Sequence, residues 1–354
     1  MKKLILMISG GISLLIFFLL LAVTGHMTKE LPEQQMAARW SGSGGVAQIS
    51  CFFSTDMDVT EDTLQEFEHS LENYMKEASI TQESENPGAR LWADAYSAEG
   101  KITLSSDNGS VEARATGIGG DFFLFHPQKL LYGAYFSGND VNQDYCIIDE
   151  DAAWQLFGSN NVAGMMVYIA GTPHIVTGVI ERPDGRLVEA AGLDSTHVYV
   201  SLSTLERYGS SHDINHYEIV MPNPVKEFAL KYVKEQLGKE EKETEILENT
   251  SRFSLLNRLR VIRAFGTRSM NGKAIIYPYW ENVARAYEDI IGLLTVFMLI
   301  FLLYPSVLTI VFFVRWWRHK GWTFKSVWLK IKDKFENLRD RHYAARLRKE
   351  EEKL

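Results

Sequence analysis

The chain has 354 residues, of which 46% are hydrophobic and 23% charged, with a formal net charge of −8. This length and composition fit a globular protein with a sizeable core and room for two small domains. The acidic balance argues against nucleic acid as a partner.

The N-terminus carries an apolar run, Leu4 to Val23, behind Lys2 and Lys3. It reaches the roughly 20 residues that cross a hydrocarbon core and is longer than the apolar part of a signal peptide. We therefore predict an uncleaved transmembrane helix over residues 1–23. Ser9 and Ser13 form a small-xxx-small pair, which suits either packing against another helix or simple exposure to lipid.

A linker over residues 24–45, ending in "SGSGG", leads into a β-α-β unit. "VAQISCFFS" predicts a strand, and the helical spacing of apolar residues from Leu64 to Met75 predicts a helix. Thr60 is its expected N-cap, with Val59 and Leu64 as a hydrophobic staple. "ARLWADAYS" predicts the next strand.

Residues 101–210 have a different texture, rich in glycine and short strands, which predicts an inserted β-rich subdomain. "MMVYIAGTPHIVTGVI" predicts a hairpin across a Gly-Thr-Pro turn. "DEDAAWQLFG" predicts a short helix that Gly158 ends, and "THVYVSL" predicts a strand.

The stretch "GIGGDFFLFHPQKLL" within this segment suggests a ligand cradle at first sight. It lacks the G-x-G-x-x-G spacing and a following phosphate-binding helix. We expect Gly117, Gly119 and Gly120 to allow a tight turn into a strand. The apolar side chains that we expect in the core are those of Phe122, Phe123, Phe125, Leu130 and Leu131.

A second β-α-β unit follows. "HYEIVMP" predicts a strand, and the next helix has Asn223 as expected N-cap, Pro224 at its first position and Gly238 as its stop. "ETEILEN" predicts the last strand. The two units, residues 46–100 and 211–288, are expected to share one porter-like α+β subdomain with a helical layer over one sheet.

The second apolar run, Ile290 to Val314, predicts one kinked or tilted transmembrane helix around Pro305, over residues 289–314. "RWWRHK" follows it, so the positive-inside rule places both termini in the cytoplasm and the bulk of the chain outside. There Cys51 and Cys146 are permitted a disulfide, or they are two buried small side chains; the sequence leaves both open.

The tail, residues 315–354, holds 13 Lys and Arg against 6 Asp and Glu, with an apolar stripe at helical spacing. A basic amphipathic helix of this kind binds anionic lipid, or docks on a cytoplasmic ATPase or a partner helix. The residues expected to face the membrane or partner are Arg315, Trp316, Trp317, Arg318, Phe324, Trp328, Ile331 and Phe335.

The sequence predicts no enzyme and no catalytic, cofactor-binding or metal-binding residues. His212 and His216 are spaced for a metal but lie in turn-like and strand-like sequence rather than on a helix. "DMDVTED" fails the calcium-loop signature, and the acids of "DEDAAW" suit a helix N-terminus. G-x-S-x-G, S-x-x-K and Walker A motifs are absent from the sequence.

The order of elements, with "GDFF…GAYF", "AWQLFG" and "VAGMMVYIAGTPHIVTGVI" between the two β-α-β units, resembles the MacB-like periplasmic core domain of ABC-transporter permeases. That group also includes lipoprotein-export and FtsX-type permeases. The resemblance covers roughly residues 1–310 and is most specific from Gly119 to Ile180. It implies a porter-like α+β subdomain with an inserted β-rich one.

The resemblance further implies a permease-type subunit of an ABC export or mechanotransmission complex, with an ATPase subunit in trans and a second permease subunit or a homodimer as partner. Permeases of this group usually have four membrane helices, whereas this sequence predicts two. A membrane-anchored scaffold or sensor that keeps the fold without transport is therefore the alternative hypothesis. A membrane-anchored hydrolase has only weak acid clusters behind it.

Overall fold

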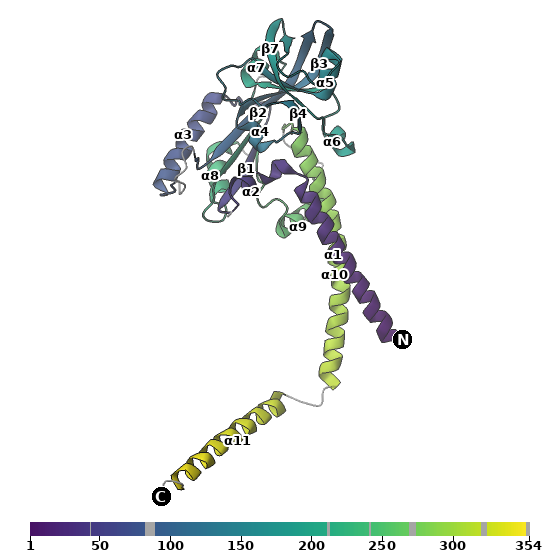
Figure 1. Ribbon diagram of the computed structural model, residues 1–354, viewed down its shortest axis with the longest axis vertical. Coiled ribbons are helices and arrows are strands. Elements are labelled where there is room, and N and C mark those ends of the chain that lie inside the picture. Colours follow the sequence, from purple (N-terminus) through teal and green to yellow (C-terminus); the bar gives the residue numbers. More distant parts are fainter. Residues whose placement is uncertain are drawn as a thin grey trace. The chain divides into compact units, whose positions relative to one another are not determined.

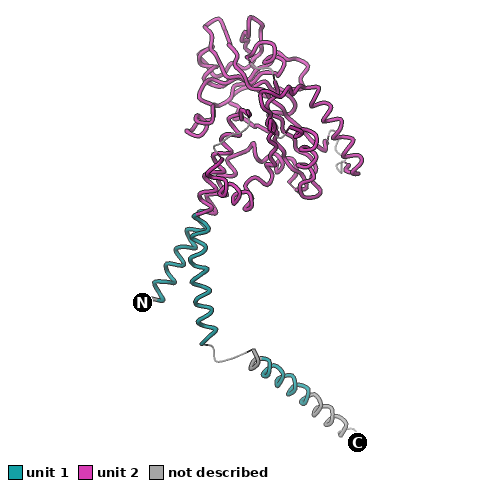
Figure 2. Tube along the Cα trace, turned by 180° about the vertical axis from the view of Figure 1, so that it is seen from behind, with its two compact units in different colours: residues 1–20, 297–354 teal, residues 21–296 magenta. Residues whose placement is uncertain are grey.

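The computed structural model describes residues 1–42, 44–81, 89–210, 213–240, 242–268, 274–319 and 324–351. The chain forms two compact units, coloured separately in Figure 2. One unit consists of residues 1–20 and 297–354, and the other of residues 21–296.

Two helices are long and apolar enough to cross a membrane: α1 (Lys2–Lys29) and α10 (Tyr279–His319). Both predicted spans are therefore helical, and α10 continues through Pro305. In the first unit the Ser9 hydroxyl lies 2.7 Å from the Tyr304 hydroxyl, and Ser13 donates to the Phe301 carbonyl at 2.7 Å. Of the two alternatives for the serine pair, the structure thus has helix packing.

The predicted tail helix is present as α11 (Phe324–Glu351). Its side chains are described for residues 328–341, and Trp328 and Phe335 are 69% and 72% exposed. The side chain of Phe324 lies outside the described set. Binding of the apolar stripe to lipid and its docking on a partner protein both remain predictions.

The second unit is built on a ten-stranded sheet (Figure 1). At one end the strand order is β10-β1-β9-β2, with every neighbouring pair antiparallel. With α3 between β1 and β2, and α8 between β9 and β10, this is the ferredoxin-like arrangement of two split β-α-β units. The bounds are β1 (Val46–Phe53), α3 (Glu61–Glu77), β2 (Ala93–Ser106), β9 (His216–Pro222), α8 (Phe228–Leu237) and β10 (Thr244–Glu248).

The rest of the sheet closes on itself. The path β2-β3-β8-β5-β7 continues to β6, and β6 pairs with β2 again, so six strands form a ring without free edges. β4 pairs with β7 outside this ring. The strand bounds are β3 (Gly109–Gly120), β4 (Leu130–Gly133), β5 (Tyr145–Asp149), β6 (Met166–Ile169), β7 (Thr172–Ile180) and β8 (His197–Ser201). The remaining helices are η1 (Pro32–Gln35), α2 (Met36–Trp40), α4 (Phe122–Phe125), α5 (Glu150–Phe157), α6 (Arg186–Ala190), α7 (Leu202–Tyr208) and α9 (Leu255–Ala264).

Two apolar clusters lie on opposite faces of the sheet. Alternate residues of β1 and β9, such as Ile49 and Tyr217, pack beneath α3 and α8, where Phe67 and Tyr232 meet at 5.8 Å between ring centroids. This is the helical layer that the sequence predicts. The second cluster gathers α2, α4 and the start of α10 on the other face. The residues that build the candidate site lie on the same face as this second cluster, beside Trp280.

Several local predictions need correction. Helix α8 begins at Phe228, so Asn223 is not its N-cap; Glu227 takes that place with a left-handed φ of 66°. The Asn223 carboxamide instead accepts a hydrogen bond from the Ala229 amide at 3.1 Å. The hairpin turns at Ala170-Gly171, both at positive φ, because two left-handed residues match the twist of the flanking strands. Thr172 and Pro173 already belong to β7.

The glycine-rich stretch is structural, as expected, but its glycines end β3 rather than lead into a strand. A Cβ on Gly119 would lie 2.0 Å from the Tyr96 ring. Gly120 has a φ of 63°, and a Cβ there would lie 2.7 Å from the Asp94 carbonyl oxygen. Phe122, Phe123 and Phe125 are buried, while Leu130 and Leu131 are half-buried.

Both cysteines are free and buried, so the alternative of two buried small side chains holds. Thr60 caps α3 and Gly158 ends α5 in a left-handed conformation, as predicted. The division of the second unit into residues 46–100 plus 211–288 and an inserted 101–210 stays a prediction.

Candidate functional site at the start of α10

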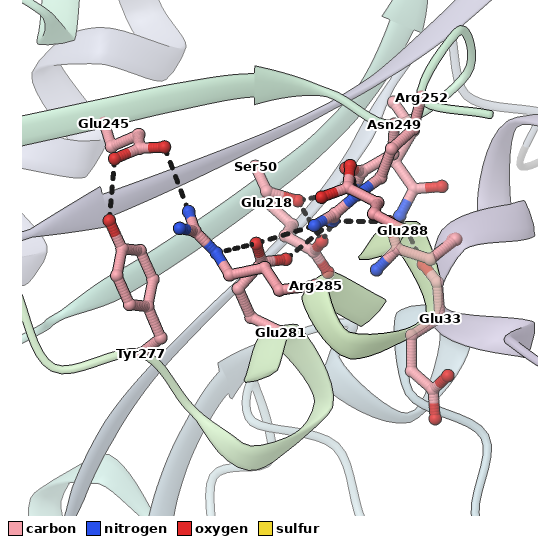
Figure 3. Close-up of polar contacts among 12 residues, drawn as sticks. Glu33, Ser50, Glu218, Glu245, Asn249, Arg252, Tyr277, Glu281, Arg285 and Glu288 are labelled. Carbon is pink, nitrogen blue, oxygen red and sulfur yellow. Dashed lines mark hydrogen bonds and ion pairs between the residues drawn. The ribbon is translucent and has the colours of Figure 1, made fainter. Parts of the chain in front are cut away.

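The first turns of α10 carry three charged residues, Glu281, Arg285 and Glu288, on one face of the helix. Arg252, in the turn between β10 and α9, meets this face. Its guanidinium donates from Nη1 and Nη2 to the two oxygens of Glu281, at 2.6 and 2.8 Å, and from Nε to Glu288 at 2.8 Å (Figure 3). A planar guanidinium suits this two-point contact.

The same arginine reaches the chain that follows α1. Arg252 Nη1 also donates to the side chain of Gln34, in η1, at 3.0 Å. Arg268, just after α9, lies on the other side and makes one hydrogen bond to Glu288 at 2.6 Å and an ion pair to Asp289 at 2.9 Å. One buried guanidinium therefore joins the segment after α1, the turn after β10 and the first turns of α10.

A second arm of the network ends on the edge strand β10. Arg285 donates to Glu281 at 2.7 Å and to Glu245 at 2.9 Å, and its guanidinium lies 3.8 Å above the Tyr277 ring (Figure 3). The Tyr277 hydroxyl donates to the other oxygen of Glu245 at 2.7 Å. The cation–π contact and the paired acids hold Arg285 in one orientation.

The centre of this network is buried. Arg252 and Glu281 are 5% and 1% exposed. Burial alone would lower the pKa of Arg252, but the carboxylates of Glu281 and Glu288 outweigh it and hold that pKa above its usual value. The charges are thus fixed as ion pairs. Removing Arg252 would leave each buried carboxylate with one guanidinium, Glu281 with Arg285 and Glu288 with Arg268.

A second polar cluster, formed by His126, His216 and Glu218, lies on the same face of the sheet. His126 follows α4, whereas His216 and Glu218 are alternate residues of β9 and so point to one side. His126 Nε2 lies 2.8 Å from Glu218 Oε2, and His216 Nε2 lies 3.8 Å from Glu218 Oε1. All three side chains are buried, beside the ring of Trp280.

Hydrogen bonds orient the members of this second cluster. Ser50 donates to Glu218 Oε1 and itself accepts from the Asn249 amide at 2.6 Å (Figure 3). His216 Nδ1 and the Ser97 hydroxyl lie 3.3 Å apart. Burial would raise the pKa of Glu218, but the two histidines outweigh it and keep that pKa well below its usual value.

Neither cluster was predicted from the sequence. The signal for the second was present in "HYEIV", where polar residues alternate in a strand that is buried on both faces. The spacing of His216 pairs it with His212 as a candidate metal ligand, and His212 lies outside the described residues. Asp149 caps α5 and also accepts from the His197 amide at 2.7 Å, so it serves the structure as expected. The tail residues Trp316 and Trp317 are exposed, and both rings lie 5.8 Å from the Phe313 ring, tilted against it.

A family model described as the MacB-like periplasmic core domain matches residues 4–231. The match covers more than half of the chain. The chain belongs to this family. It is accordingly a membrane protein with two apolar helices and an extracytoplasmic domain of the kind found in ABC-transporter permeases. Family membership confirms the resemblance that the motifs from Gly119 to Ile180 indicate.

Curated relatives match over shorter stretches. The macrolide export ATP-binding/permease protein MacB of Pasteurella multocida is 31% identical over 78 residues, which are 22% of this chain and 12% of that protein. The MacB of Chromobacterium violaceum is 28% identical over 109 residues, 30% of this chain and 16% of that protein. The aligned part therefore spans less than a fifth of these relatives' length.

Solved structures include the periplasmic region of MacB from Actinobacillus actinomycetemcomitans, at 18% identity and a TM-score of 0.41, covering 60% of this chain and 92% of that one. The extracellular domain of the ABC-type transporter YknZ from Gram-positive bacteria has 17% identity and a TM-score of 0.38, covering 56% of this chain and 99% of that one.

Proposed function

We propose that this protein is the permease-type membrane subunit of an ABC export or mechanotransmission complex and works with an ATPase supplied by another chain. Both termini are cytoplasmic in this proposal, and the extracytoplasmic domain contacts a partner or cargo. A second permease subunit or a second copy of this chain completes the membrane part. The protein itself has no catalytic role.

The observation that carries the proposal is the ionic network around Arg252. It ties the edge strand β10 and the segment after α1 to Glu281 and Glu288, and α10 continues without a break into the apolar span. A rigid helix whose start is fixed by buried ion pairs is suited to pass a movement between the outer domain and the membrane. Family membership supports the same role.

The basic tail supplies the cytoplasmic contact in this proposal. Residues Arg315, Trp316, Trp317 and Arg318 end the second span, and α11 presents exposed Trp328, Ile331 and Phe335. Lipid headgroups of negative charge and an ATPase subunit are the two surfaces that such a helix fits.

The test is a detergent pull-down of the full chain, with and without residues 315–354, followed by mass spectrometry of the copurifying proteins. We expect an ATP-binding subunit with the full chain and its loss with the truncated one. Should no ATPase appear under conditions that retain other membrane partners, the scaffold or sensor hypothesis replaces this one. The two candidate spans in the described residues, against four usual for the permeases, are what favour that alternative.

A further inference from the structure

Several polar atoms in the cluster of His126, His216 and Glu218 have no hydrogen-bond partner among the described residues, although all three side chains are buried. His126 Nε2, His216 Nε2 and Glu218 Oε2 make no hydrogen bond to any described residue. His126 Nε2 and Glu218 Oε2 are only 2.8 Å apart, yet they are not aligned for one. Buried polar atoms of folded proteins almost always have a partner, so this arrangement calls for one.

The three residues lie close enough together to share one ion. One ligand atom from each residue lies within 4.8 Å of the other two. In a tetrahedral zinc site, with bonds of about 2.0–2.2 Å, neighbouring ligand atoms are about 3.3–3.6 Å apart. His126 Nε2 lies 2.8 Å from Glu218 Oε2, and His216 Nε2 lies 3.8 Å from Glu218 Oε1, so each imidazole is near one oxygen of the same carboxylate at a distance close to that spacing.

The surroundings are those of a metal-binding set. With Ser97 as acceptor, the Nδ1 proton of His216 is fixed and Nε2 keeps its lone pair for a ligand. Ser50, held by Asn249, donates to the second oxygen of Glu218 and orients that carboxylate. Two imidazoles with one carboxylate suit zinc and its first-row neighbours, whereas calcium and magnesium prefer oxygen ligands throughout.

We propose that His126, His216 and Glu218 bind one divalent transition-metal ion, with Zn²⁺ as the ion to test. The ion satisfies three of the unpartnered buried atoms and leaves only His126 Nδ1 of this group. It joins β9 to the chain after α4, beside Trp280 at the start of α10. Because the site is buried, the protein takes up the ion as it folds. This proposal departs from the sequence-based prediction of no metal site and is independent of transport.

The test is the metal content of the full-length protein, purified in detergent through an affinity tag without histidine and passed over a chelating resin. We expect about one zinc ion per chain, measured by plasma mass spectrometry. His216→Gln and Glu218→Gln should each lower this content at least several-fold. His174→Gln is the matched control, because His174 is equally buried but hydrogen-bonded to Thr172 and Thr204.

A second measurement uses the wild-type protein, so it does not depend on the folding of any variant. Protein produced with Co²⁺ in place of Zn²⁺ should show the visible absorbance of a tetrahedral cobalt site, and refolding in the presence of a strong chelator should lower its thermal midpoint. The proposal is overturned if folded wild-type protein lacks stoichiometric transition metal. It is equally overturned if His174→Gln loses the metal to the same extent as His216→Gln, which would indicate an adventitious ion only.

Discussion

Arg252 and Glu281 form a two-point ion pair, with Nη1 to Oε2 and Nη2 to Oε1 distances of 2.6 and 2.8 Å, at a place where both side chains are almost fully buried. Arg252 belongs to the outer domain's β10–α9 turn, and Glu281 to the first turn of the helix that becomes an apolar span. The pair fixes the turn after β10 to the start of α10, next to the contact of Arg285 with Glu245 on β10.

Breaking this pair should destabilise the second unit strongly. Among the described residues, Arg252→Met leaves Glu281 only Arg285 as a charged partner and Glu288 only Arg268. Removing one member of a buried ion pair typically costs about 3–5 kcal/mol. For a unit of this size that lowers the thermal midpoint by roughly 10 °C, measured in detergent by circular dichroism. Arg260→Met is the control, because Arg260 is exposed and bonds only Asn257 in the described structure.

The double variant Arg252→Met, Glu281→Met tests whether the two residues act as a pair. It also removes the Glu281 carboxylate that loses Arg252 in the single variant, so it should recover part of the lost stability. If the double variant is as unstable as the sum of the single ones, the two residues do not act as a pair.

The packing of α1 on α10 predicts a difference between two neighbouring glycines. A Cβ on Gly10 would lie 3.3 Å from Leu308 Cδ1, whereas a Cβ on Gly11 meets nothing within 4 Å. Gly10→Leu should therefore separate the spans and Gly11→Leu should not, since close helix packing in membranes depends on small residues.

The Ser9 and Tyr304 hydroxyls lie 2.7 Å apart, and a short bifunctional thiol cross-linker between Cys replacements of these two residues, in place of the tyrosine ring, measures the separation. We expect the cross-linking yield to fall severalfold with Gly10→Leu. The native thiols interfere little, because burial raises the pKa of Cys146 to about 12 and raises that of Cys51 further. Equal yields for the Gly10 and Gly11 variants would contradict the packing.

Asp94 makes stability depend on pH. Burial, together with the neighbouring Glu68 carboxylate, raises the pKa of Asp94 to about 8. The pKa of an unfolded aspartate is about 3.9, so the folded state binds the proton more tightly. The stability that this proton contributes is present below about pH 4 and is lost as the pH rises to about 8. Asp94→Asn should flatten the fall of the thermal midpoint across that window. Asp107→Asn, at an exposed position, should leave it unchanged.

The elements were predictable where local chemistry decides them. The strand His216–Pro222, the Thr60 cap and the Gly158 stop follow from alternation, side-chain capping and left-handed backbone, each contained in a few consecutive residues. The start of α8 was not predictable in this way, because Pro224 suits the first position of a helix and yet the chain turns until Glu227.

The polar clusters lie beyond such patterns. Arg252 and Glu281 lie on either side of α9, and His126 and Glu218 belong to separate elements, so only tertiary packing brings each pair together. A charged residue in a sequence suggests solvent by default, since unpaired charges are rarely buried. The alternation of His216 and Glu218 within an otherwise apolar strand was the available signal, but it does not indicate that His126 lies beside them.

The exposed stripe of α11 predicts a face-dependent effect on lipid binding. Phe335 is 72% exposed and belongs to the stripe, while Asn337 lies roughly on the opposite side of the helix. In a peptide of residues 315–354, Phe335→Glu should weaken binding to vesicles of phosphatidylserine and phosphatidylcholine about tenfold or more, because burial of a phenyl ring contributes about 1.5–3 kcal/mol. Asn337→Glu adds the same charge on the polar side and should reduce binding much less. If the two variants bind vesicles equally while only Phe335→Glu abolishes ATPase capture by the full chain, the stripe serves protein docking instead of lipid.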